Sequence, residues 1–201
     1  MVVKPIDKDI PDETTLASAA RLIEAGAVVI FPSDSCYGMA TSATKPEAIE
    51  RLYKIKQRPA DKEISLIFRN LDQVKQWAYV DQQQEKILTK NLPGPFTFIL
   101  QAKPEAPFDS QSVGVRIPDN TLTRALSNLI STPFTATSAN ISELPSCYSV
   151  EEIQRQFSNK IYQPDLILDA GKLPQYPPST VVDIRQGRRV ILREGVARVR
   201  Y

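Results

Sequence analysis

The sequence predicts a single α/β domain in which a twisted, largely buried mixed β-sheet is flanked by helices. Three observations support this fold class. The chain has 201 residues, of which 42% are apolar, enough for one hydrophobic core. Segments with a helical spacing of apolar residues alternate with short unbroken apolar runs, as they do in α/β proteins. The last two apolar segments follow each other directly, which suits a hairpin.

Several segments have the pattern of amphipathic helices, and their ends carry recognisable signals. The first helix should stop at Gly26. Thr44 and Ser149 each precede a glutamate by three residues, which predicts a capping box at the start of two helices. The helix that follows Thr44 must end before Pro59. The expected helices are 12–25, 44–58, 71–78, 81–90, 121–130 and 149–157.

Short apolar segments between these helices predict the strands. Residues 27–31 form an unbroken apolar run, typical of a strand covered on both faces. Residues 179–184 and 188–194 predict a hairpin that turns at Gln186 and Gly187. Because this hairpin follows a series of βα units, we expect a mixed rather than a fully parallel sheet. The other expected strands lie within 32–43, 64–68, 96–100, 113–117, 134–140 and 165–171.

The composition limits the classes of function. Lysine and arginine total 25 and aspartate and glutamate total 23, so the formal net charge is only +2 and any basic site must be local. No apolar run approaches the ~20 residues of a membrane-spanning helix, and the N-terminus lacks the apolar segment of a signal peptide. Cys36 and Cys147 are far apart and form no CxxC motif. We therefore expect a protein of the reducing cytoplasm, with no membrane partner.

The sequence contains no histidine. This excludes the Ser-His-Asp and Cys-His catalytic systems and every histidine-based metal site. An enzyme of this composition has to work by positioning and by fixed positive charge, or with Mg²⁺ that arrives with a phosphate substrate. No dedicated protein site for a metal is expected.

Four cations, Lys54, Lys56, Arg58 and Lys62, are crowded where a helix ends and a strand begins. The simplest interpretation is that they complement the negative end of the helix dipole, at roughly 0.3–1 kcal/mol each. However, Arg58 precedes Pro59 and so lies in a stiff extended turn, and Lys62 lies beyond the reach of the dipole. A rigid loop that presents arginine and lysine to one point suits a polyphosphate.

Small polar residues lie next to several predicted strands, a place where α/β sheets commonly bind ligands. Ser35 follows one strand, Ser138 and Asn140 end another, and Ser179 begins a third. Ordinary turn and capping chemistry explains each of these residues alone. Arg116 lies inside the apolar segment VGVRIP, so its charge needs a partner such as an internal carboxylate or a ligand carboxylate.

The motifs PSDSCYG, KQRPADK, LPGPFTF, VGVRIPD, TSANIS and STVVDI, followed by ILREG, occur in this order. Together they resemble the YrdC family of L-threonylcarbamoyladenylate synthases, also called TsaC. The resemblance runs from about residue 12 to Arg193. It implies one YrdC-like domain over 1–201 with a core of about 12–195, a concave basic cavity, and the short form of the family without an additional C-terminal domain.

The resemblance also implies a reaction. The family is a group of nucleotidyltransferases that condense L-threonine, bicarbonate or CO₂, and ATP into L-threonylcarbamoyl-AMP and pyrophosphate. This is the first step of N6-threonylcarbamoyladenosine (t6A) modification at position 37 of tRNAs that read ANN codons. Transferase proteins of the TsaB, TsaD and TsaE type are the implied downstream partners. Mg²⁺ is expected to enter with ATP, near Ser138 and Asn140, and no organic cofactor is expected.

Residues of this chain that match the family motifs inherit expected roles. Lys56 and Arg58 are implied to be catalytic, as part of the grip on the triphosphate. The residues implied to bind ATP are Lys56, Arg58, Lys62, Ser112, Ser138, Asn140, Ser146 and Arg193. The residues implied to bind threonine are Ser35, Arg116, Ala136 and Ser179. Among these, Ser112, Ala136 and Ser146 are the weaker matches.

The chain departs from the family pattern at four positions. Ser35 stands where threonine is frequent, and Ile67 stands where many longer members have histidine. Glu143 replaces a common glycine and would be strained by about 1 kcal/mol if its turn needs a positive φ. Glu194 replaces the usual proline and puts an anion next to Arg193.

Two other functions remain open at this level. An RNA-binding or ribosome-associated module of the same fold would use the C-terminal arginines, because phosphate contacts need only spaced cations. These are Arg185, Arg188, Arg189, Arg193, Arg198 and Arg200. A solvated hairpin edge explains the same run, and a net charge of +2 allows only weak, salt-sensitive contact with tRNA. A paralogue that acts on another carbamoylated or adenylylated substrate is the other alternative.

Overall fold

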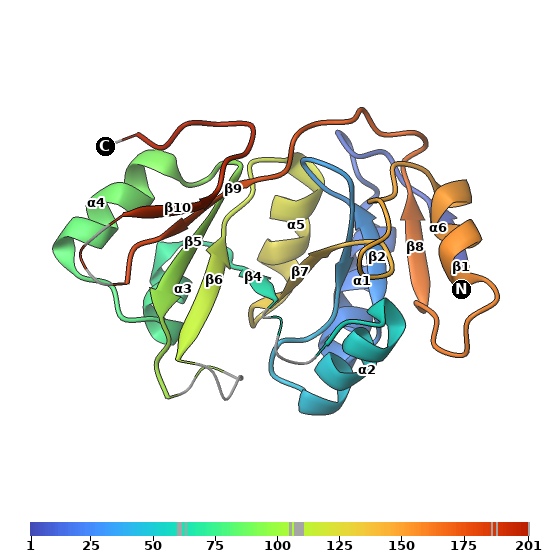
Figure 1. Ribbon diagram of the computed structural model, residues 1–201. Helices are drawn as coiled ribbons and strands as arrows, with labels where there is room; N and C mark the ends of the chain where they lie inside the picture. Colours follow the sequence, from blue (N-terminus) through green and yellow to red (C-terminus); the bar gives the residue numbers. More distant parts are fainter. Residues whose placement is uncertain are drawn as a thin grey trace.

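The structure is a computed structural model that describes residues 1–59, 62, 64–104, 106, 111–185, 187 and 189–200. Ten strands form one sheet in the order β1-β8-β2-β3-β7-β4-β6-β5-β9-β10 (Figure 1). Neighbours such as β2 and β8 are parallel, whereas β2 and β3 are antiparallel. The prediction of a mixed α/β sheet is therefore confirmed.

The elements follow the predicted order along the chain. The strands are β1 (Val2–Pro5), β2 (Val29–Pro32), β3 (Tyr37–Ala40), β4 (Ser65–Ile67), β5 (Phe96–Gln101), β6 (Ser112–Arg116), β7 (Phe134–Ser138), β8 (Leu166–Asp169), β9 (Thr180–Asp183) and β10 (Val190–Arg193). The helices are α1 (Glu13–Ala25), α2 (Pro46–Lys56), α3 (Leu71–Trp77), α4 (Gln82–Asn91), α5 (Thr121–Leu129) and α6 (Val150–Phe157). Strand β1 was not predicted; it is an exposed edge strand that pairs with β8, so the sheet begins ahead of the expected core at residue 12.

Helix ends show where local sequence signals hold. In α1, the Asp12 carboxylate accepts the Thr15 N–H at 2.7 Å, and Gly26 ends the helix at φ 94°, as predicted. In α6, the Ser149 hydroxyl accepts the Glu152 N–H, as in a capping box. The Glu152 carboxylate, however, accepts the N–H of Tyr148 and not that of Ser149. One half of the predicted capping box is thus present.

The capping box predicted at Thr44 is wrong. Helix α2 begins at Pro46, so the capping position falls on Lys45, whose side chain makes no capping hydrogen bond. The Thr44 hydroxyl pairs instead with the hydroxyl of Ser42 at 2.9 Å. Proline at the first helical position sets this register, because its fixed φ starts the helix and it needs no acceptor for an N–H.

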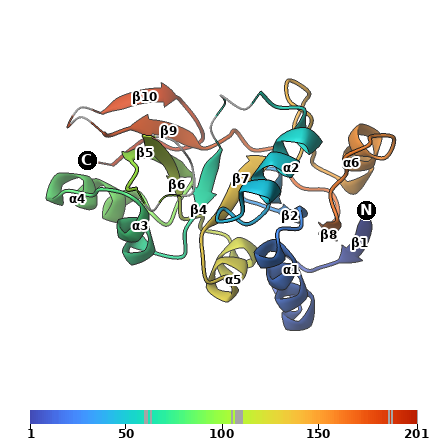
Figure 2. The same ribbon diagram turned by 90° about the horizontal axis from the view of Figure 1, so that it is seen from below.

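Helices cover the sheet on two sides (Figure 2). Helices α1, α3, α4 and α5 lie along one face, and α2 and α6 lie on the other. Buried apolar side chains fill three clusters between these layers, such as the one that joins Leu16 and Ile23 of α1 to Leu122 and Leu126 of α5. Within the described part of the chain, no helix combines the length and apolar character that crossing a membrane requires.

Strand β7 is central because it joins the two halves of the sheet. On one edge it pairs with β3, where Gly38 lies opposite Ser138. On the other edge it pairs with β4, where Ser65 lies opposite Ala136. Since β4 has only three residues, the last part of β7 runs on beyond it. This leaves room at the middle of the sheet, on the face that also carries α2.

The predicted C-terminal hairpin is present as β9 and β10, which pair in antiparallel fashion. Gly187 in its turn has φ 67°, a conformation that favours glycine. Gln186 and Arg188, which belong to the predicted turn and to the predicted basic run, lie outside the described residues.

Glu143 has φ 71°, so the condition for strain at this position is met. We expect Glu143→Gly to raise the free energy of unfolding by up to about 1 kcal/mol, because glycine adopts this conformation without a Cβ clash. Urea unfolding would measure the change. Glu143→Ala is the matched control: it keeps the Cβ and removes only an exposed carboxylate 3.8 Å from Lys62. Equal stabilisation by alanine and glycine would contradict the conformational explanation.

Candidate functional site

A cavity of about 400 Å³ opens on the sheet face between the end of α2 and the β9–β10 hairpin. Residues that alternate along neighbouring strands form much of its wall, because side chains on one face of a strand recur every two residues. These residues are Gly38, Ser65, Ile67, Thr97, Ile99, Gly114, Arg116, Ala136, Ser138 and Val181. Arg58 and Arg193 also belong to its wall. Its volume is in the range typical of small-molecule sites.

Small residues keep this face hollow. A Cβ on Gly114 would lie 2.7 Å from the Ser65 hydroxyl oxygen, and a Cβ on Gly38 would lie 3.0 Å from the Phe31 ring. Ala136 contributes only a methyl group to the same wall. Because larger side chains here would fill the space, the depth of the cavity is a direct consequence of these residue types.

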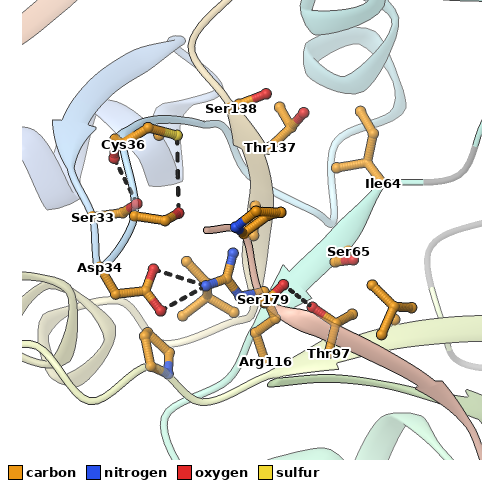
Figure 3. A pocket seen from close by; sticks show the side chains of 18 of the residues that line it. Ser33, Asp34, Cys36, Ile64, Ser65, Thr97, Arg116, Thr137, Ser138 and Ser179 are labelled. Carbon is orange, nitrogen blue, oxygen red and sulfur yellow. Dashed lines mark hydrogen bonds and ion pairs between the residues drawn. The ribbon is translucent and has the colours of Figure 1, made fainter. Parts of the chain in front are cut away.

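Arg116 finds an internal carboxylate, one of the two partners that its place in the sequence suggested. Its Nη2 donates to both carboxylate oxygens of Asp34 at 2.9 Å (Figure 3). The two side chains are 16% and 18% exposed. The Arg116 Nε is buried and has no hydrogen-bond partner among the described groups. The guanidinium thus keeps donor capacity for a ligand.

Arg193, Ser179 and Thr97 form a second polar group in the cavity wall. Arg193 donates from Nε and Nη2 to the Ser179 carbonyl at 3.1 and 2.9 Å, and from Nη2 to the Ser179 hydroxyl at 3.1 Å. The Ser179 and Thr97 hydroxyls lie 3.0 Å apart. Burial lowers the pKa of Arg193, and the positive charge of Arg116 lowers it further. Two guanidinium groups this close favour an anion between them.

The turn that follows α2 places Arg58 at the cavity. Gln57 ends the helix at φ 50°, and the Lys62 carbonyl accepts the Arg58 Nε at 3.0 Å and the Tyr53 hydroxyl at 2.8 Å. These bonds hold the turn in a defined shape. The Lys62 ammonium lies 3.8 Å from the Glu143 carboxylate and is not part of the cavity wall.

Lys56 does not line the cavity, although it was expected to hold the triphosphate. Its side chain is 1% exposed, and its Nζ donates to the main-chain carbonyls of Ser138 at 2.6 Å and Asn140 at 2.9 Å. The Ser142 N–H in turn donates to the Lys56 carbonyl at 2.7 Å. Burial lowers the pKa of Lys56 to about 7, and the nearby charge of Arg58 adds to the effect. Lys56 therefore ties the turn after α2 to the turn after β7.

Asn140 has a similar internal role. Its Nδ2 donates to the carbonyls of Ile141 at 2.8 Å and Leu144 at 2.7 Å, and its Oδ1 accepts the Ser138 hydroxyl. Ser138 lines the cavity, whereas Asn140 does not. The amide thus shapes the turn that carries Ser138.

The structure brings together most of the residues that the sequence singled out. Those that line the cavity are Arg58, Ser138, Ser146, Arg193, Ser35, Arg116, Ala136 and Ser179. Those that are not part of its wall are Lys56, Lys62, Ser112 and Asn140. Ser112 is buried at the far end of β6 from Arg116. Ile67, which stands where longer relatives carry histidine, presents an apolar side chain to the cavity.

Sequence reasoning missed several polar groups of the wall, among them Asp34, Thr97 and Cys36. Asp34 could have been found, because an arginine inside a strand calls for a carboxylate and PSDSCYG contains one. Burial raises the pKa of the Cys36 thiol, so it stays protonated at neutral pH. In the described part of the chain, no three acidic or sulfur ligands gather where they could hold a metal ion.

The lowered pKa of Lys56 predicts a pH-dependent stability. Because the unfolded chain binds the lysine proton up to about pH 10.5 and the folded chain only up to about pH 7, the burial penalty is complete below pH 7 and disappears as the pH rises toward 10.5. In urea titrations, the free energy of unfolding of wild type minus that of Lys56→Met should therefore increase from about pH 6.5 to 9.5.

Lys54→Met is the control for this experiment. Lys54 is 47% exposed, and its hydrogen bond with Glu50 raises its pKa above 10.5, so it is charged in both states over this pH range. Its difference curve should be flat. A flat curve for Lys56→Met as well would show that the folded protein keeps this lysine protonated.

Comparison with known proteins agrees with this geometry. A model of the Sua5/YciO/YrdC family, which carries the description "Telomere recombination", matches residues 21–195. A Methanocaldococcus jannaschii relative, named as a candidate threonylcarbamoyl-AMP synthase, is 37% identical over 85% of this chain and 81% of its own. The threonylcarbamoyl-AMP synthase of Vibrio parahaemolyticus is 32% identical over 86% of this chain and 95% of its own.

Solved structures show the same fold. Pyrococcus abyssi Sua5 complexed with L-threonine superposes with a TM-score of 0.88 at 28% identity, and Escherichia coli YciO with 0.87 at 29% identity. This chain spans 58% of the Sua5 chain and 98% of the YciO chain. The family match covers most of the described strands and helices and all of the cavity wall. The chain belongs to the Sua5/YciO/YrdC family.

Proposed function

We propose that this protein forms L-threonylcarbamoyl-AMP and pyrophosphate from L-threonine, bicarbonate or CO₂, and ATP. The observation that carries the proposal is the convergence of Arg58, Arg116 and Arg193 on one cavity whose wall also carries several hydroxyl groups and small residues. Such a wall suits a small polar amino acid next to a polyphosphate. The names of the relatives and the threonine-bound Sua5 structure support the same reaction.

The chemistry needs charge neutralisation more than proton transfer. The neutral threonine amine adds to CO₂ and loses a proton, which gives a carbamate. A carbamate oxygen then forms a bond to the α-phosphorus of ATP, and the bond from that phosphorus to the bridging oxygen breaks, so that pyrophosphate leaves. Positioning and fixed cations can assist both steps, so a chain without histidine is adequate.

The three arginines are suited to different groups of the substrates. Arg58 and Arg193 line the cavity and are suited to phosphate oxygens. Arg116 shares its charge with Asp34 and offers its remaining guanidinium donors to the threonine carboxylate. Lys56 acts indirectly, by holding the main chain at Ser138, and Lys62 stiffens the turn of Arg58. Mg²⁺ enters as part of the ATP substrate, on the side of Ser138.

The wider role that we propose is the first step of t6A modification at position 37 of ANN-decoding tRNAs. The adenylate is reactive and has to be consumed by transferase proteins of the TsaB, TsaD and TsaE type, which act with tRNA in the cytoplasm. The RNA-binding alternative has less support, because the Arg185 guanidinium donates to both carboxylate oxygens of Asp183. The paralogue alternative is not favoured by the names of the relatives and is separated by the test below.

The test is pyrophosphate release by the purified protein without RNA. We expect release only when threonine, bicarbonate and ATP are all present, with an acid-labile threonylcarbamoyl adenylate as the other product. Valine should replace threonine poorly, because it leaves a pocket hydroxyl unpaired. Release without threonine, or equal turnover of valine, would point to a paralogue with another substrate. Tight tRNA binding with no adenylate would favour the RNA module.

Arg58→Ala tests the phosphate grip. The loss of a forked donor should cost about 1.5–3 kcal/mol in transition-state stabilisation, which lowers kcat/KM about 10- to 150-fold. The melting temperature should barely change, because the side chain lines the cavity. Arg21→Ala, an exposed arginine of α1, is the matched control and should leave kcat/KM unchanged. Full activity of Arg58→Ala would remove this residue from the site.

A further inference from the structure

Strand β10 brings Arg193 to the cavity, although the strand itself is poorly packed. It is the last strand of the sheet, and all four of its residues, Val190–Arg193, are exposed (Figure 1). The strand therefore buries little apolar surface that could hold it in place. Its pairing with β9 is also irregular, because the register shifts between Ile191 and Arg193. The position of Arg193 in the cavity wall thus needs support from another part of the chain.

The chain beyond β10 supplies this support by crossing the turn that leads into β9. A Cβ on Gly195 would lie 2.2 Å from the Pro178 carbonyl oxygen and 2.4 Å from the Thr180 nitrogen. Both are main-chain atoms, which cannot turn aside as the end of a flexible side chain can. Only a residue without a side chain fits at this crossing, so Gly195 sets how closely the two segments approach.

Hydrogen bonds close this crossing around one hydroxyl group. The Thr180 hydroxyl donates to the Ala197 carbonyl at 2.5 Å and accepts the Gly195 N–H at 3.1 Å. Beside it, the Val196 N–H donates to the Pro178 carbonyl at 3.1 Å. Thr180 is 2% exposed, so its hydroxyl is used as donor and as acceptor inside the protein. We call these three hydrogen bonds the C-terminal clasp.

The segment after the clasp is anchored to helix α4. The Asn91 side chain donates from Nδ2 to the Arg200 carbonyl at 2.8 Å and accepts the Arg200 N–H at 2.7 Å. Val199 is buried in the hydrophobic cluster that also contains Ile87 and Leu88 of α4. The clasp therefore connects a poorly packed strand to a segment that is held on the body of the protein.

The turn held by the clasp carries the hydrogen-bond partner of Arg193. Ser179 lies between Pro178 and Thr180, and its carbonyl oxygen accepts the Arg193 Nε at 3.1 Å and Nη2 at 2.9 Å. Because the clasp fixes the residues on both sides of Ser179, it also fixes the oxygen that orients the guanidinium. Thr180 itself is not part of the cavity wall, so it acts on the cavity through its neighbours.

We propose that the C-terminal clasp, with Thr180 at its centre, positions the Arg193 guanidinium for the polyphosphate of the nucleotide substrate. The proposal rests on the proposed function, because that function supplies the nucleotide. It makes Thr180 a positioning residue and gives the chain after β10 a part in substrate binding. An arginine that is already oriented loses less conformational freedom when phosphate binds, and this is the source of the gain in affinity.

Thr180→Val removes the hydroxyl and keeps the shape and strand preference of the side chain. We expect the Kd of α,β-methylene-ATP with Mg²⁺, measured by calorimetric titration, to rise about 3- to 10-fold, as for one weakened hydrogen bond to a charged group. Thr180→Ser keeps the hydroxyl and should bind the analogue as wild type does. Thr41→Val is the matched control and should leave the Kd unchanged. Thr41 is also buried, but its hydroxyl has no partner among the described residues, and it is not part of the cavity wall.

A double-mutant cycle tests whether Thr180 acts through Arg193. In an Arg193→Ala background the clasp has no guanidinium to orient, so Thr180→Val should change the Kd by less than about twofold. Losses that multiply in the double variant would show that the two residues act independently and would overturn the proposal. An equal effect of Thr41→Val and Thr180→Val would overturn it as well.

Gly195→Ala attacks the clasp without removing a hydroxyl. It forces the two crossing segments apart and should raise the same Kd. Gly171→Ala is its control: a Cβ there meets no atom within 4 Å, but φ is 74°, so alanine is strained. This control should lower the free energy of unfolding and leave the Kd unchanged. If it weakens nucleotide binding as much as Gly195→Ala does, general stability is the cause and the proposal is wrong. Should Thr180→Val fail to fold, this pair of glycine variants decides.

Two further measurements separate the clasp from the proposed reaction. Amide hydrogen exchange at Gly195 and Val196 should be faster in Thr180→Val than in wild type. Faster exchange with an unchanged Kd would show that Arg193 does not depend on the clasp, and wild type that does not bind the analogue would equally overturn the proposal. Wild type that binds the analogue but releases no pyrophosphate with threonine, bicarbonate and ATP would instead overturn the proposed function and leave the clasp to be judged by the titrations.

Discussion

The pairing of β7 with two different neighbours is the constraint on which the rest of the structure depends. This strand joins β3 on one edge and β4 on the other, so both halves of the sheet meet along five residues. Because β4 has three residues and β7 has five, the last residues of β7 extend beyond β4. Glycine and alanine at this place, such as Gly114 and Ala136, leave the face hollow. The cavity is thus a property of strand lengths and of side-chain size.

The turns after α2 and β7 form one unit. Lys56 donates to the main chain of the second turn, and the Ser142 N–H donates back to the Lys56 carbonyl. A neutral amine has two N–H groups, which match the two carbonyls, so the low pKa of this lysine does not cost either bond. Gln57 and Glu143 both adopt positive φ values within this unit. Strain of this kind persists only where the surrounding contacts over-determine the backbone, and here those contacts hold Arg58 and Ser138 against the cavity.

The charges of the cavity are arranged for anions. Asp34 neutralises part of Arg116, which makes it possible to bury a guanidinium in the middle of a sheet without a bound ligand. Arg193 is held by carbonyl and hydroxyl oxygens and keeps its full charge. An anionic substrate therefore meets one partly compensated and one uncompensated cation. This asymmetry makes the two neighbouring cations different for an anionic ligand.

The sequence by itself determined the features that depend on near neighbours along the chain. Asp12 and Gly26 mark the ends of α1, apolar runs mark the buried strands, and the ordered series of motifs identifies the family and several residues of the cavity wall. Near the start of α2, Thr44 and Pro46 are two competing start signals, and the observed helix begins at Pro46.

Tertiary structure decided the rest, because contacts such as Arg116 with Asp34, 82 positions apart, depend on sheet register. Tertiary structure also decided the burial of Lys56, because its position in a basic motif does not determine the direction of its side chain. It decided the edge strand β1 as well, because the partner of this strand lies near the other end of the chain.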